Sequence, residues 1–167
     1  LRTRARRLAG LFQLGRSGNS DYEMQSYKLR THGSFEFFLD SAVNGVANDV
    51  YIIAQNQEFN KAAMQPLYDG IAPLPEFMLP DSSTGFFWIG GATMTPLHHD
   101  LTNNLMCQVL GEKHVRMVSP DQFDKIDHRE GVHSNIGWLT DEVARERGIE
   151  VRDVYLEPRD ALFVPVG

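Results

Sequence analysis

A chain of 167 residues suits one domain with its own core, and 42% hydrophobic residues with 10% aromatic ones is an ordinary globular composition. No apolar run approaches the roughly 20 residues of a membrane-spanning helix, and a net charge of −6 argues against a nucleic-acid partner. Cys107 is the single cysteine, which excludes a disulfide within the chain and favours a reducing, cytoplasmic location.

The first 16 residues form a basic arm that holds five arginines and no acidic residue. Such an arm can contact nucleic acid or an acidic surface, but more often it is a solvated helix face, and we expect that here. The polar, glycine-containing stretch 17–33 predicts a loop that leads into a short strand at residues 27–29.

The next elements are predicted from caps, periodicity and prolines. Ser34 is suited to cap a helix over residues 35–43. The β-branched and aromatic stretch 50–53 predicts a strand, and residues 58–65 predict a helix that Pro66 ends. The prolines that follow predict a connecting loop. Residues 1–85 are therefore expected to be a helical and mixed N-terminal part.

From residue 86 onward, short apolar runs alternate with turn residues, which predicts an antiparallel barrel or sandwich. An insertion over residues 119–150 holds a short helix near 122–126 and a second helix at 141–147, with Thr140 as its N-cap and Gly148 after its end. The expected strands are 86–89, 94–98, 105–109, 114–118, 151–156 and 161–164.

The triplet His98-His99-Asp100 is the first candidate for chemistry. On an extended strand, residues i and i+2 share a face, so His98 and Asp100 would point together and His99 away. One imidazole and one carboxylate are two of the three ligands in the facial triad that holds Fe(II) with open positions. The spacing alone is a weak signal, because such triplets arise easily by chance.

The wider context is more specific. The run from Thr95 to Asp100, followed by Asn104, Gly111 and Lys113 and by Ser-Pro-Asp-Gln-Phe at residues 119–123, resembles the cupin-like Jumonji-C family over residues 86–167. Within that family the pattern is most similar to the asparaginyl hydroxylases that act on hypoxia-inducible factor. The resemblance implies a mainly β chain with N-terminal helices, built on a double-stranded β-helix (jelly roll) that binds Fe(II) and 2-oxoglutarate.

Carried over by position, His98 and Asp100 would be metal ligands. Lys113 would pair with the distal carboxylate of 2-oxoglutarate. A lysine inside a barrel is costly unless an anion meets it, and a dicarboxylate is such an anion. The alternative for Lys113 is a surface lysine in a tight turn.

Three further residues are assigned to the cosubstrate pocket by the resemblance. Thr95 would hydrogen-bond the distal carboxylate, Tyr51 would approach it from the earlier strand, and Asn104 would line the same pocket. Thr95 and Asn104 could equally satisfy turn backbone, and Tyr51 could be a core aromatic residue.

The chain departs from the family pattern at two places. The third metal ligand is expected just beyond Gly167, so the simplest explanation is a truncated or incompletely represented chain. Arg159 stands where relatives usually have glycine, at a turn that requires a positive φ. The stretch that begins at His133 also resembles the family, with loop packing as the alternative to covering the mouth of the site.

The predicted function is an Fe(II)- and 2-oxoglutarate-dependent oxygenase that uses dioxygen on a protein side chain or a small molecule, with a homodimer left open. A non-catalytic cupin-like binding module with an incomplete metal site is the alternative. A metal-dependent isomerase or hydrolase of the wider cupin class is a third reading, although such sites usually cluster more histidines.

Overall fold

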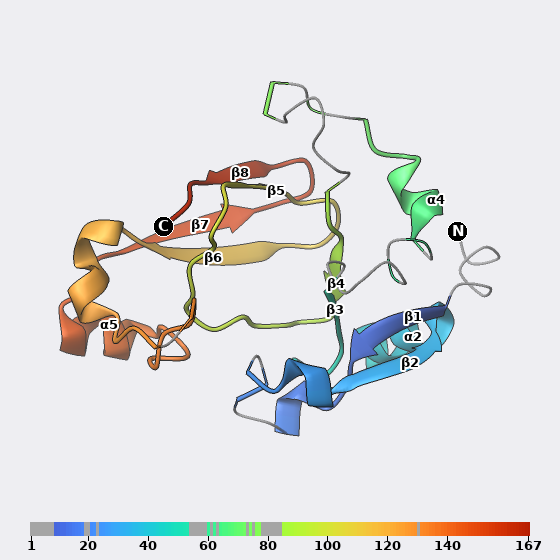
Figure 1. The fold of residues 1–167 in the computed structure, drawn as a ribbon, viewed down its shortest axis with the longest axis horizontal. Helices are drawn as coiled ribbons and strands as arrows, with labels where there is room; N and C mark the ends of the chain where they lie inside the picture. The colour runs from blue at the N-terminus through green and yellow to red at the C-terminus, as the bar shows by residue number, and fades with distance from the viewer. Residues whose placement is uncertain are drawn as a thin grey trace. The chain divides into compact units, whose positions relative to one another are not determined.

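The computed structural model describes residues 9–18, 21–22, 24–53, 60, 62, 64–72, 74, 76–77, 85–129 and 131–167. Two compact units make up the chain, Leu1–Met94 and Thr95–Gly167 (Figure 1). This division falls nine residues after the predicted one, which follows residue 85. Among the described helices, none has both the length and the apolar character needed to cross a membrane.

The first unit contains a four-stranded antiparallel sheet with the strand order β2-β1-β3-β4. Gln13 at the end of β1 lies opposite Tyr51 at the start of β3, and Tyr51 lies opposite Gly90 of β4. The sheet therefore places Tyr51 on a central strand. The strands are β1 (Ala9–Gln13), β2 (Arg30–Ser34), β3 (Tyr51–Ile53) and β4 (Trp88–Gly90).

Helix α2 (Phe35–Asn44) packs its apolar side against this sheet. Its start was predicted correctly, because the Ser34 side chain accepts a hydrogen bond from the Phe37 backbone N–H. Burial of aromatic and aliphatic side chains is the main stabilising contribution here. The buried cluster consists of Phe12, Phe35, Phe38, Val50, Ile52 and Met64.

Two predictions about the N-terminal arm were wrong over its described part. Residues 9–13 form strand β1, not a helix face, and Arg16 is fully buried instead of solvated. Residues 1–8 lie outside the described residues. The predicted strand at 27–29 is also wrong, because Ser26–Lys28 is a 3-10 turn (η2) and the strand begins at Arg30. Strand β1 reads Ala-Gly-Leu-Phe-Gln, which lacks the alternation of apolar and polar residues that predicts a strand.

Proline 66 does not end a helix. It lies in the first turn of α4 (Gln65–Tyr68), where its missing N–H costs nothing. Residues 60 and 62 of the predicted 58–65 helix are helical, and residues 58 and 59 lie outside the described residues. The first unit thus carries more strand than the helical and mixed part that was predicted.

In the second unit, four strands pair as two antiparallel ribbons, β5 with β8 and β6 with β7. The chain is mainly β, as predicted, and the prediction of β7 and β8 is accurate to the residue. The predicted strand at 94–98 is wrong, since the structure has only an isolated bridge there, between His98 and His133. The strands are β5 (Asn104–Cys107), β6 (Lys113–Val118), β7 (Val151–Leu156) and β8 (Ala161–Val164).

The insertion between β6 and β7 holds a 3-10 segment, η3 (Pro120–Lys125), and helix α5 (Asp141–Arg147). The caps of α5 match the prediction: Thr140 accepts from the Val143 N–H, and Gly148 is left-handed with φ of 64°. After β7, Arg159 has φ of 90°, so the turn does impose the positive φ that the sequence indicated.

Candidate metal and cosubstrate site

The segment that carries His98 is held by a loop from the insertion. The Leu97 N–H donates to the Gly137 carbonyl at 2.8 Å, and the His99 N–H donates to the Val132 carbonyl at 2.9 Å. In return, the Ser134 N–H donates to the Leu97 carbonyl at 3.0 Å. These three bonds fix the backbone on both sides of His98 without a regular strand, so nonlocal pairing replaces the strand that was predicted.

The orientation of His98 is set by its own turn. Its Nδ1 lies 2.8 Å from the Pro96 carbonyl oxygen. A carbonyl oxygen can only accept, so Nδ1 carries the proton in the neutral imidazole and Nε2 keeps its lone pair. Histidines that bind metals commonly have their other ring nitrogen held by a backbone carbonyl in this way. In this tautomer the Nε2 of His98 has a lone pair that could bind a cation; that it does so stays a prediction.

One carboxylate oxygen of Asp100 lies near His98, and the other accepts a hydrogen bond from Asn104. The Nε2 of His98 and the Oδ1 of Asp100 are 4.0 Å apart. The Oδ2 of Asp100 accepts a hydrogen bond from Asn104 Nδ2 at 2.8 Å. Asn104 also donates to the Thr102 carbonyl at 3.3 Å. Asn104 thus holds the carboxylate in place, a role that the sequence did not reveal; its predicted place in the cosubstrate pocket stays a prediction.

The two donor atoms fit a divalent first-row metal. With bonds of about 2.1 Å, cis ligands of one octahedral ion lie about 3.0 Å apart. The 4.0 Å separation needs only a small side-chain rotation, and both side chains have room for it, being 33% and 44% exposed. Within the part of the chain that the structure describes, no third His, Cys, Asp or Glu joins them.

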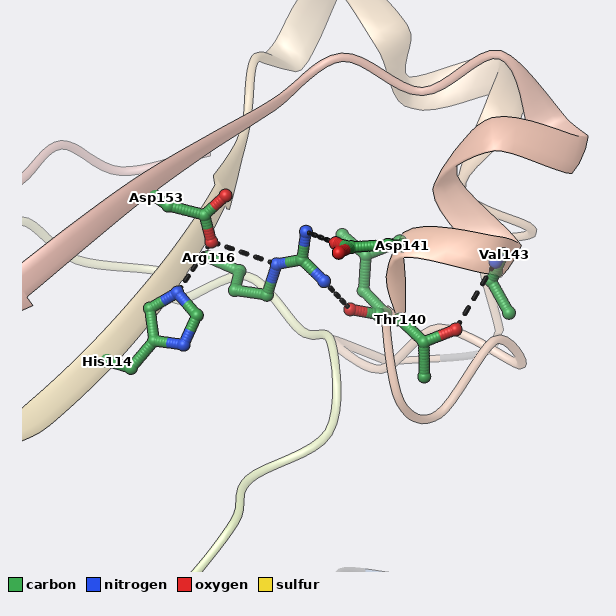
Figure 2. Close-up of polar contacts among 7 residues, drawn as sticks. His114, Arg116, Thr140, Asp141, Val143 and Asp153 are labelled. Carbon is green, nitrogen blue, oxygen red and sulfur yellow. Dashed lines mark hydrogen bonds and ion pairs between the residues drawn. The ribbon is translucent and has the colours of Figure 1, made fainter.

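Lys113 lies on the covered face of the β6–β7 ribbon. Its partner in the register is Leu156, which is buried, and residues directly opposite each other share a face. The alternate residues His114 and Arg116 lie on the other face, where they contact Asp153 (Figure 2). Burial lowers the pKa of the Lys113 ammonium, because desolvation penalises the charged form.

The other predicted cosubstrate residues are placed as follows. Thr95 is exposed, in irregular backbone three residues before His98. Tyr51 belongs to the first unit, where it starts strand β3. Their contacts with a cosubstrate stay predictions.

Four of the histidines form two pairs of neighbouring rings. The ring of His133 lies 5.9 Å from that of His98, centroid to centroid. His99 instead stacks at 5.8 Å on His128, which in turn lies 5.0 Å from the Phe123 ring. His98 and His99 therefore have different ring partners, as the prediction that His99 points away requires. His133 is a neighbour of the site that sequence spacing alone did not assign, because the 34 intervening residues hide the pairing.

Comparison with known proteins gives the family. A family model described as a cupin-like domain matches residues 5–167. The chain is 29% identical over 146 residues to lysine-specific demethylase 8 of Danio rerio, which covers 77% of this chain and 34% of that protein. It is 38% identical over 40 residues to JmjC domain-containing protein D of Dictyostelium discoideum, which covers 23% and 9%. The chain thus matches about a third of the length of the first relative.

The finer likeness to asparaginyl hydroxylases stays a prediction, because these matches reach the family and no further. The match to the cupin-like family model begins at residue 5, well before residue 86, where the resemblance carried by the sequence motifs begins. The β1–β4 sheet therefore lies within the matched region together with His98 and Asp100. The chain belongs to the cupin-like domain family, of the Jumonji-C type.

Proposed function

We propose that this chain is the Fe(II)- and 2-oxoglutarate-binding part of an oxygenase that hydroxylates a protein side chain or a small molecule. The observation that carries the proposal is the pair His98 and Asp100, whose facing atoms Nε2 and Oδ1 are 4.0 Å apart. Their other polar atoms are engaged by Pro96 and Asn104. Membership of the Jumonji-C type and a relative named as a demethylase support the same reading.

The residues of the candidate site would have separate roles in binding the metal and the cosubstrate. His98 and Asp100 would hold the metal, and Asn104 would keep the Asp100 carboxylate turned toward it. When bound, Fe(II) with 2-oxoglutarate and dioxygen supplies the oxidising power: 2-oxoglutarate yields succinate and CO2, and one oxygen atom enters the C–H bond of the substrate. Lys113 would anchor the distal carboxylate with help from Thr95, and this would orient the keto acid.

The lowered pKa of Lys113 gives the proposal a pH signature. Only the ammonium form pairs with a carboxylate, and burial disfavours that form in the ligand-free protein. Cosubstrate binding would raise the pKa of Lys113 back toward its usual value, so binding takes up a proton at alkaline pH. The affinity for 2-oxoglutarate should fall as pH rises through the lowered pKa, and Lys113→Met should bind weakly with a flatter pH profile.

The test is succinate formation by the full-length protein, with Fe(II), 2-oxoglutarate and dioxygen each withheld in turn. We expect succinate only with all three, even uncoupled from a substrate, and a loss of at least about 100-fold in His98→Ala. Binding of 2-oxoglutarate without succinate would favour the non-catalytic cupin-like module. Metal-dependent turnover of another substrate that ignores 2-oxoglutarate would favour an isomerase or hydrolase.

A further inference from the structure

Ser134 is a buried polar residue in the loop that holds the His98 segment. Its relative exposure is 7%. Its hydroxyl donates to the Ile126 carbonyl and accepts from the Ile136 N–H at 3.0 Å. A hydroxyl that accepts from the N–H two positions further on closes a Ser/Thr turn. The Ser134 side chain therefore joins the two ends of the loop 126–136.

The same loop is also paired through its backbone. The Asn135 N–H donates to the Asp127 carbonyl at 2.9 Å. Ser134 itself forms an isolated antiparallel bridge with His128. Removal of the Ser134 hydroxyl would take a partner from two backbone groups at the ends of this loop, and polar groups that lose a partner on burial favour rearrangement. The backbone position of Ser134 thus depends on its own side chain.

The backbone of Ser134 in turn contacts the segment that carries the candidate metal ligands. Its N–H donates to the carbonyl of Leu97, the residue before His98, at 3.0 Å. The residue before Ser134, His133, forms an isolated antiparallel bridge with His98 itself. Metal ligands must be held to within about 0.5 Å of their working positions. A shift of Ser134 would therefore be passed to His98 and would move its ring relative to Asp100.

We propose that Ser134 is a positioning residue for metal binding by His98. Its hydroxyl holds the loop in the conformation in which its N–H meets the Leu97 carbonyl, and this bond places the His98 imidazole beside the Asp100 carboxylate. All of these residues belong to the second unit. The inference rests on the proposed function, because it needs His98 and Asp100 to be metal ligands. It goes further by naming a residue that acts on the metal only through His98.

The test compares Ser134→Ala with Thr140→Ala in the full-length protein. Both changes remove one hydroxyl from the insertion, but the Thr140 hydroxyl accepts from the Val143 N–H at the start of α5. Calorimetry without 2-oxoglutarate gives the Kd for Co(II). We expect Ser134→Ala to weaken binding about tenfold and Thr140→Ala to change it by less than about twofold. Both variants should have a lower melting temperature than the wild type.

Cobalt also gives a signature that a loss of stability alone does not produce. The visible absorption of bound Co(II) depends on the number and geometry of its ligands. At saturation we expect the spectrum of Ser134→Ala to differ from that of the wild type, and the spectrum of Thr140→Ala to match it. A Ser134→Ala protein with the wild-type Kd and spectrum overturns the inference and leaves the proposed function intact. A wild-type protein that binds no divalent metal overturns the proposed function, and the inference with it.

Hydrogen exchange in the unmodified protein covers the case in which Ser134→Ala does not fold. The amide protons of Ser134 and Ile136 are followed by NMR while zinc, which is diamagnetic and redox-inert, is added. If this loop positions His98, a metal bound by His98 must also stabilise the loop, because coupling between sites is reciprocal. We expect both amides to exchange at least about fivefold more slowly at saturating zinc, and the Val143 amide to slow much less. Unchanged exchange at Ser134 and Ile136 in the zinc-loaded protein overturns the inference.

Discussion

The two units of this chain are stabilised by different means. The described part of the first unit packs an aromatic and aliphatic cluster between helix α2 and a four-stranded sheet. Among the described residues of the second unit, the buried apolar side chains are few: Ala144, Ile149 and Leu156. Polar contacts connect its ribbons and helix instead. The candidate metal ligands lie in this second, hydrogen-bonded unit.

One arginine illustrates how the second unit is connected. Arg116 of β6 forms ion pairs with Asp153 of β7 at 3.0 Å and with Asp141 of α5 at 2.5 Å, and it donates to the Leu139 carbonyl at 2.6 Å (Figure 2). His114 contacts the same Asp153 oxygen at 2.6 Å. Such directional contacts define geometry more than they add stability. The comparison teaches that core packing supports the first unit, while single hydrogen bonds set the geometry at the site.

The largest effect is expected from removing an aromatic side chain from the apolar core of the first unit. Phe38 is 0% exposed, and its ring lies 5.4 Å from that of Phe12 and 5.7 Å from that of Phe35. Phe38→Ala should lower the free energy of unfolding by about 3–5 kcal/mol, measured by denaturant titration. Phe37→Ala, on the same helix but 51% exposed, is the matched control and should lose much less. Equal losses would contradict the packing described for α2.

A smaller effect, confined to the site, is expected from removing a single hydrogen bond. Asn104→Ala removes the donor that holds Asp100 Oδ2 and should weaken metal binding about 10–100-fold. The neighbouring Asn103 accepts from the Val166 N–H at 2.8 Å and contacts neither candidate ligand through a described hydrogen bond. Asn103→Ala is therefore the control for metal titrations followed by calorimetry. An Asn104→Ala protein with wild-type metal affinity would show that Asp100 needs no support.

Local signals predicted more of this structure than nonlocal ones. Ser34 and Thr140 were identified as helix caps because capping depends on a few adjacent residues. The burial of Arg16 was missed, since it depends on Tyr22, Tyr51 and the Met94 carbonyl, which lie up to 78 residues away. No spacing rule in a single sequence reports such a contact.

The candidate site shows the same difference between local and nonlocal signals. The approach of His98 to Asp100 was predicted from strand alternation, but the structure has no strand there. Their donor atoms face each other because the Pro96 and Asn104 contacts orient the side chains and the 132–137 loop fixes the backbone. The motif therefore indicated two side chains that do face each other, but by an incorrect local geometry; that they bind a metal stays a prediction. The role of Asn104 had a weak signal, its i+4 spacing from Asp100 within a turn.

The smallest predicted effect is a gain in the free energy of unfolding. It is expected at a hydrogen-bonded turn of the second unit. Arg159 has φ of 90°, and its N–H donates to the Gln108 carbonyl at 2.9 Å. A Cβ is strained at this φ, so Arg159→Gly should raise the free energy of unfolding by about 0.5–1 kcal/mol after the added freedom of the unfolded chain is counted. Arg159→Ala keeps the Cβ and should give no gain. Denaturant midpoints at an unchanged m-value measure both, and equal gains would assign the effect to the arginine side chain instead of the backbone.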